Sequence, residues 1–195
     1  MLTELYKSII MEIKYAFNQK TLNKCFDKTK PSDVKKVQRT QYAEFLEVLS
    51  TRFLPIAVEQ TTKISRYIGD ISERDLFTLW HFLHTNIKYK ADPSGIFETI
   101  KLPNHVWANR KSGGGDCEDI NGIFCSSILV NWGIEHEMII EQLSDKAAHI
   151  FVKTQNGVIL DGCNTEFNKQ VRLNNAEPLG IYRQRIDLQK SLGLE

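Results

Sequence analysis

The 195-residue chain lacks the features that mark membrane, secreted and nucleic-acid-binding proteins. No apolar run approaches the roughly 20 residues that a membrane-spanning helix needs. Charged side chains interrupt the first stretch, Met1–Lys20, so a secretory signal is not expected there. The formal net charge is only +1, which creates no overall field to attract nucleic acid or an anionic membrane. We therefore expect a cytoplasmic protein that binds neither a membrane nor nucleic acid.

Cysteine is scarce and irregularly spaced, which excludes several kinds of site. The sequence has no Cys-x-x-Cys pair of the kind that holds structural zinc, and a chain of this length does not need a disulfide framework. His81 and His84 are spaced like ligands on one helix, but no third ligand is evident. Calcium-binding loops of the DxDxDG type are also missing. We expect no metal, no cofactor and reduced thiols, at Cys25, Cys117, Cys125 and Cys163.

Apolar residues at helical spacing dominate the first third of the chain. Such spacing covers Leu2–Ala16 and Ala43–Phe53. Pro55 is expected in the first turn of a further helix, which Gly69–Asp70 would end. We therefore predict an N-terminal helical extension over residues 1–71.

The remainder, residues 72–195, changes from helical to strand patterns and is predicted to be a second domain. A strong hairpin signal, Gln155–Gly157, separates two of the expected strands. The combination predicts an α+β fold in which a helix packs on an antiparallel sheet. The expected elements are helices opening at Ser72–Asp75 and Asp116, an extended Ile87–Lys90, strands at Glu137–Glu141, Ala148–Thr154 and Val158–Asp161, and a short helix at Asp187–Leu192.

Cys117 has the local sequence of a reactive thiol. Glycines 113–115 allow a tight turn, and Asp116 is a candidate N-cap that would place Cys117 in the first turn of a helix. The amides and the positive dipole end of that turn favour a thiolate. Acidic neighbours, Glu118 and Asp119, act in the opposite direction and raise the thiol pKa. A histidine partner is therefore required, and without one Cys117 reads equally well as a buried packing residue.

His149 and Asp161 fit that requirement if the hairpin between them has the right parity. A two-residue turn would put the two side chains on opposite faces of the sheet. A three-residue loop, Gln155–Gly157, puts Phe151 opposite Asp161 and makes His149 its diagonal neighbour. We predict the three-residue loop, although Asp161 alone would also suit an ordinary turn before Gly162. Cys163 is either structural or a second thiol near the site.

Taken together, these motifs resemble the transglutaminase-like branch of the papain superfamily. The resemblance covers about Ser72 to Phe167 and implies a papain/transglutaminase-like core with a Cys117, His149, Asp161 triad. Trp107 would supply an oxyanion donor through its indole N–H. The motifs that carry the likeness are Leu79–Trp80, Asn86–Tyr89, Gly115–Asp119, Gly133–Ile134, His149–Val152 and Ile159–Asp161.

The resemblance implies acyl transfer from a protein or peptide substrate through a cysteine nucleophile. With water as acceptor the chain would be a peptidase or amidase, and with an amine it would be a transglutaminase-like cross-linker. Gly115 and Asp116 are expected to lie at the oxyanion or substrate site. The sequence departs from the family at Gly162 and Glu135, where proline is frequent.

A second interpretation follows from the run between Glu98 and Cys117, which is similar to versions in phage and prophage genes. It implies a phage-encoded protein associated with the virion. The alternative to an enzyme is therefore a virion structural or assembly protein, with or without residual activity. Such a protein would use this fold as a scaffold and bind phage structural proteins through its N-terminal helices.

Overall fold

A computed structural model describes residues 17–38, 40–72, 74–93, 97–145, 147–170 and 177–194. The predicted amphipathic stretch Leu2–Ala16 lies outside these residues. Within them, no helix combines the length and the apolar character that crossing a bilayer requires.

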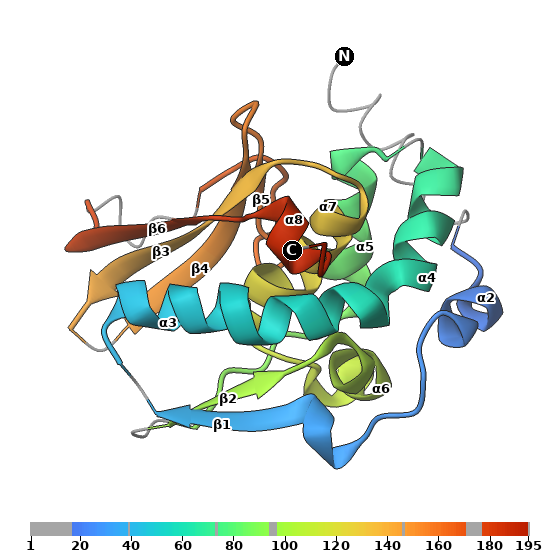
Figure 1. Cartoon of the computed structure of the whole chain (residues 1–195), viewed down its shortest axis with the longest axis horizontal. Helices are drawn as coiled ribbons and strands as arrows, with labels where there is room; N and C mark the ends of the chain where they lie inside the picture. The colour runs from blue at the N-terminus through green and yellow to red at the C-terminus, as the bar shows by residue number, and fades with distance from the viewer. Residues whose placement is uncertain are drawn as a thin grey trace.

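A four-stranded antiparallel sheet forms one side of the molecule (Figure 1), in the order β5-β4-β3-β6. Three strands lie where the sequence predicted them, whereas β6 was not predicted. Together with the helices, the sheet confirms the α+β class. The bounds are β3 His136–Ser144, β4 Ala147–Thr154, β5 Ile159–Leu160 and β6 Gly180–Arg185.

A long helical segment crosses the sheet and consists of α3 (Tyr42–Val48), the π-helix η2 (Leu49–Phe53) and α4 (Leu54–Ser72). Pro55 lies in the first turn of α4 as predicted, but α4 continues η2 without a break and ends at Ser72 rather than at Gly69–Asp70. Proline cannot donate to the carbonyl four residues earlier, and the wider π turn lies directly before it. Leu46, Leu49 and Phe53 are buried as the spacing predicted, but Ala43 is exposed.

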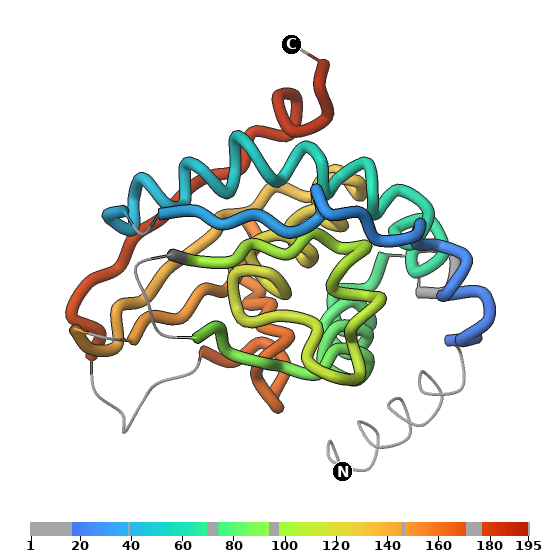
Figure 2. The backbone as a smooth tube through the Cα atoms, turned by 90° about the horizontal axis from the view of Figure 1, so that it is seen from below, coloured from blue at the N-terminus to red at the C-terminus, as the bar shows by residue number. Residues whose placement is uncertain are grey.

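A second, two-stranded sheet lies beside this segment (Figure 2) and pairs β1 (Val34–Gln38) with β2 (Phe97–Lys101). The sequence predicted neither strand, because the pattern of β1 shows no apolar–polar alternation: Lys35 and Lys36 are both exposed. The pairing joins residues on the two sides of Ser72. The division into two domains there remains a prediction.

The other helices pack around a core that includes residues from most of the elements. Asp75, the last residue of the stretch predicted to open a helix, caps α5 by accepting from Phe77 N–H. Gly133, with φ +69°, ends the helix that carries Cys117. The helices and turns are α2 Gln19–Lys24, η1 Pro31–Asp33, α5 Leu76–Asn86, α6 Pro103–Gly113, the π-helix η3 Glu118–Cys125, α7 Ser126–Asn131 and α8 Leu188–Ser191.

His136, at the start of β3, is buried with one ring nitrogen unpaired. Its Nδ1–H donates to Ile134 O at 2.8 Å, while Nε2 has no partner among the described residues. Burial, opposed by the bond to Ile134, lowers the pKa of His136 from 6.5 to about 4. The ring is therefore neutral in the native protein at neutral pH.

We expect this histidine to make the protein acid-labile. In the unfolded chain His136 is protonated below about pH 6.5, whereas in the native chain it is protonated only below about pH 4. The free energy of unfolding therefore falls as the pH falls through that window. The full loss is about 3 kcal/mol. Urea unfolding at pH 7 and pH 4.5 should show a smaller loss for His136→Phe than for wild type. Equal losses would contradict this role.

Candidate active site

A tight turn delivers Cys117 to the start of η3. Gly115 forms a parallel bridge with Tyr89, and Gly114 N–H donates to Lys88 O at 3.0 Å. The absence of a side chain at Gly115 is required, because a Cβ there would lie 2.6 Å from the Cβ of Asp119. The turn therefore packs the nucleophile loop between the segment before it and the helix after it.

Asp116 does not cap the helix in the predicted way. Its Oδ2 accepts from Asp92 N–H at 3.3 Å, whereas Asp119 Oδ2 reaches back to accept from Asp116 N–H at 3.3 Å. Asp116 Oδ1 is buried without a partner among the described residues. Asp119 thus satisfies the amide that precedes the thiol, and the N-cap assignment of Asp116 is corrected.

The shortness of β5 opens the edge of β4 to this helix. The strand pairs with β4 only at Val152 and Lys153, so Ile150 lies beyond the end of the ladder. Its backbone lowers the pKa of the Cys117 thiol slightly, against the larger effect of burial, and its carbonyl accepts from Asn121 Nδ2 at 2.9 Å. The residue that follows His149 is therefore bonded to the helix that carries Cys117.

His149 and Asp161 meet as the hairpin parity predicted. Val152 pairs with Leu160, a register that places Phe151 opposite Asp161, and Gly157 has φ +84°. His149 Nε2–H donates to Asp161 Oδ2 at 2.7 Å. The Asp161 side chain is 2% exposed and that of His149 is 14% exposed, so the pair is shielded from water while the imidazole retains an accessible edge.

Asn121 is a member of the site that sequence reasoning missed. Its Nδ2 donates to Asp161 Oδ1 at 2.8 Å, and its Oδ1 accepts from Gly162 N–H at 2.8 Å. Trp80 Nε1–H also donates to Asp161, at the backbone oxygen, at 3.0 Å. The available signal was position: Asn121 follows Cys117 by four residues on one helix, which places the two side chains on neighbouring turns.

Cys117 rests as a neutral thiol in this structure. Burial, followed by Glu118, Cys163 and Asp116, raises the pKa of the Cys117 thiol well above its ordinary value of 9.0. The S–H donates to Glu118 Oε2 at 3.4 Å, and no hydrogen bond joins it to His149 within the described part of the chain. Asp161 holds Nε2 of His149 and leaves the other ring nitrogen, Nδ1, unoccupied by that carboxylate.

We expect Glu118→Gln to make this thiol more acidic. Removing a neighbouring negative charge favours the thiolate, so the midpoint of iodoacetamide alkylation should move down by about 1 pH unit. The rate should be followed by mass spectrometry of the Cys117 peptide from pH 6 to pH 11. Glu135→Gln is the control, since Glu135 is paired with Arg185. An unchanged profile in Glu118→Gln would contradict the assigned electrostatics.

Lys101 supplies the cation for the acidic cluster around the thiol. Its Nζ lies 2.9 Å from Asp119 Oδ2 and 2.7 Å from Asp92 Oδ1. Burial alone would lower the pKa of Lys101, but Asp119 and Asp92 raise it overall. Burial and the nearby Asp116 carboxylate raise the pKa of Asp119 above its ordinary value. No group of three or more potential metal ligands is found in the described residues.

Trp107 does not face the thiol, so its predicted role as an oxyanion donor is wrong. The indole N–H donates to Asn23 Oδ1 at 3.2 Å, and the ring is stacked with Phe26 and Phe82 in the core. Tyr89 instead lies beside the nucleophile loop, with 47% of its surface exposed. Burial and the nearby Cys117 raise the pKa of its phenol.

Comparisons with known proteins add little to this geometry. No protein-family model matches the chain, and no curated protein matches it. A solved structure of Legionella pneumophila LapG, in its calcium-bound form, is similar over 64% of this chain and 75% of that chain, at 16% identity and a TM-score of 0.36. A likeness at that TM-score carries no argument about the fold or the site.

Proposed function

We propose that this chain is a cysteine-nucleophile acyl-transfer enzyme with a transglutaminase-like, papain-type core. The observation that carries the proposal is the edge of β4. There, His149 bonds to Asp161 at 2.7 Å, and Asn121, four residues after Cys117 on the same helix, donates to Asp161 at 2.8 Å and to Ile150 O at 2.9 Å. A thiol, an imidazole and a carboxylate gathered in this order are the groups that thiol acyl transfer needs. The sequence resemblance supports the same reaction.

In the proposed reaction, His149 Nδ1 accepts the Cys117 proton as the sulfur attacks an amide carbonyl. Asp161 holds Nε2 and stabilises the imidazolium. Because the thiol pKa is raised, the proton moves during the attack rather than before it. The backbone N–H of Cys117, in the first turn of its helix, is our candidate donor to the oxyanion, since Asp119 already occupies the N–H of Asp116.

The tetrahedral intermediate then collapses to a thioester. The C–N bond breaks, and the imidazolium gives its proton to the leaving amine. The acceptor comes next: His149 takes a proton from water or from an amine, which attacks the thioester and regenerates the thiol. Water yields an acid and makes the enzyme a peptidase or amidase, whereas a lysine amine yields a new amide bond.

The test uses dimethylcasein as acyl donor and monodansylcadaverine as amine. Wild type should release ammonia or cleave casein, and should attach the amine if amines are accepted. Cys117→Ala should show none of these activities, whereas the matched thiol variant Cys25→Ala should keep them. Equal activity in wild type and Cys117→Ala would overturn the proposal. An inactive wild-type protein that does not form a thioester would favour the scaffold interpretation.

A further inference from the structure

A further feature of the structure is a basic pocket of about 570 Å³ between α2 and the C-terminal ends of α5 and α6. Lys88, Arg110 and Lys111 line it, and none of the described residues that line it is acidic. Since the whole chain carries a net charge of only +1, three cations around one cavity are a strong local excess. None of the three is paired with a carboxylate within the described part of the chain.

Arg110 is held in place before any ligand arrives. Its Nη1 donates to Trp107 O at 2.8 Å, its Nη2 donates to Asn23 Oδ1 at 3.1 Å, and its guanidinium lies 4.1 Å above the Trp107 ring. A fixed guanidinium loses little freedom on binding and retains donors for a further oxygen. Part of its role is to cap α6, whose C-terminal carbonyls favour a cation. Lys88 and Lys111 are exposed and make no such contact.

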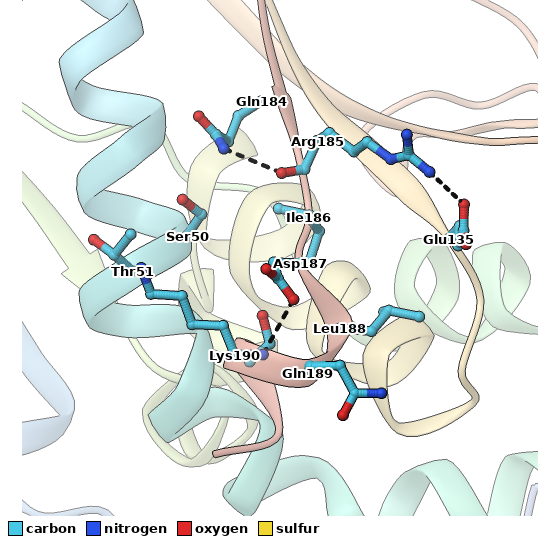
Figure 3. A pocket seen from close by; sticks show the side chains of 11 residues that line it. Ser50, Thr51, Glu135, Gln184, Arg185, Ile186, Asp187, Leu188, Gln189 and Lys190 are labelled. Atoms are coloured by element: carbon cyan, nitrogen blue, oxygen red, sulfur yellow. Dashed lines mark hydrogen bonds and ion pairs between the residues drawn. The ribbon is translucent and has the colours of Figure 1, made fainter. Parts of the chain in front are cut away.

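A second cavity shows the opposite arrangement (Figure 3). It lies between η2 and the β6–α8 connection, and its Arg185 is paired with Glu135 at 2.7 Å. Asp187, also in its wall, caps α8 by accepting from Lys190 N–H. The second cavity therefore contains both acidic and basic side chains, whereas the charged residues that line the basic pocket are all cationic.

Two connections lead from the wall of the basic pocket to the loops of the proposed site. Lys88 precedes Tyr89, which bridges Gly115 of the nucleophile loop. On the other side, His84 donates from Nδ1 to Gly162 O at 3.2 Å, directly after Asp161. The wall of the pocket is therefore linked to the nucleophile loop and to the loop after Asp161. Triad residues do not line the pocket.

We propose that the pocket binds an anionic carboxylate or phosphate group of the substrate, so that acidic peptides are preferred. This inference rests on the proposed function for the source of the anion, but binding at the pocket does not require activity. The same oxygens on a small free anion would satisfy Lys88, Arg110 and Lys111, so the test separates the two sources.

Binding is measured by intrinsic fluorescence, since Trp107 lies under Arg110 and Trp80 stacks on His84. Inorganic phosphate should change the emission saturably, with a Kd of about 1 mM or below at low salt. Lys88→Gln/Lys111→Gln should bind about fivefold or more weakly. Lys190→Gln, which removes an exposed cation from the other cavity, should bind like wild type. Unsaturable binding, or equal affinity in all three proteins, would overturn the pocket.

Whether the bound anion belongs to a peptide substrate or is a small free anion is tested with acetylated tri-glutamate amide and its tri-glutamine analogue. The glutamate peptide should compete with phosphate and the glutamine peptide should not. Phosphate binding without competition by the glutamate peptide would overturn the assignment to substrate and leave a site for free anions. Cys117→Ala should give the same results as wild type, so a failed acyl-transfer mechanism is distinguishable from a failed pocket.

Discussion

Replacing His149 by alanine should lower acyl transfer by about 10³-fold while leaving the fold intact. The resting thiol donates a hydrogen bond to Glu118, and its raised pKa leaves almost no thiolate at neutral pH. Only a nearby base can remove that proton as the sulfur attacks. His149 is the base in our proposal, since Asp161 holds its Nε2 and leaves Nδ1 to accept the proton.

The pH dependence distinguishes this base from a merely structural histidine. In wild type, His149 takes the thiol proton during the attack, so the reaction does not depend on a free thiolate. In His149→Ala, the residual rate should instead rise with pH until the thiol itself ionises. His105→Ala is the control, since His105 lies on α6 and its Nδ1 is hydrogen-bonded to Thr29 Oγ1 at 3.4 Å. A variant of His149 with near wild-type activity and pH profile would refute the role.

Replacing Asn121 by alanine should destabilise the protein by about 3 to 5 kcal/mol. The side chain is fully buried and joins η3 to β4 and to the loop after Asp161. Its loss leaves Ile150 O and Gly162 N–H without their buried partner, and each such group costs about 1 to 3 kcal/mol. Urea unfolding measures the difference.

The same change should also impair the reaction in molecules that remain folded, because Asn121 positions the Asp161 carboxylate. The expected signature is a lower kcat with little change in KM. Asn109→Ala is the control, since Asn109 lies on α6 and bonds only to its own helix, at His105 O. Its stability should change by less than about 1 kcal/mol. If both variants unfold at the same urea concentration, Asn121 does not join these elements.

The sequence predicted the strands β3, β4 and β5, and the pairing of His149 with Asp161, because these depend on short-range rules. A glycine in the left-handed region fixes the hairpin loop, and the loop fixes the face on which each side chain lies. Asp75 and Gly133 bound their helices for equally local reasons. Such signals lie within a few residues of the feature that they specify.

The features that the sequence did not predict depend on contacts between residues outside the local motif. Strand β1 pairs with β2, which lies about 60 residues away in the sequence. The residues of Val34–Gln38 alone carry no pattern that predicts a strand or its partner. The indole of Trp107 finds Asn23 on α2 rather than the thiol. Asp119, not Asp116, satisfies the amide at the start of the helix because Gly115 lets its carboxylate approach. Tertiary contacts decide each of these outcomes.

Accumulation of an acyl-thioester on Cys117 is the most direct test of the account. The protein should be mixed with p-nitrophenyl acetate, and the burst of nitrophenolate should be followed together with the intact mass. We predict one acetyl group per wild-type chain, located on Cys117, and a much slower burst in His149→Ala. Acetylation that persists in Cys117→Ala, or that proceeds equally fast without His149, would contradict a thiol activated by that imidazole.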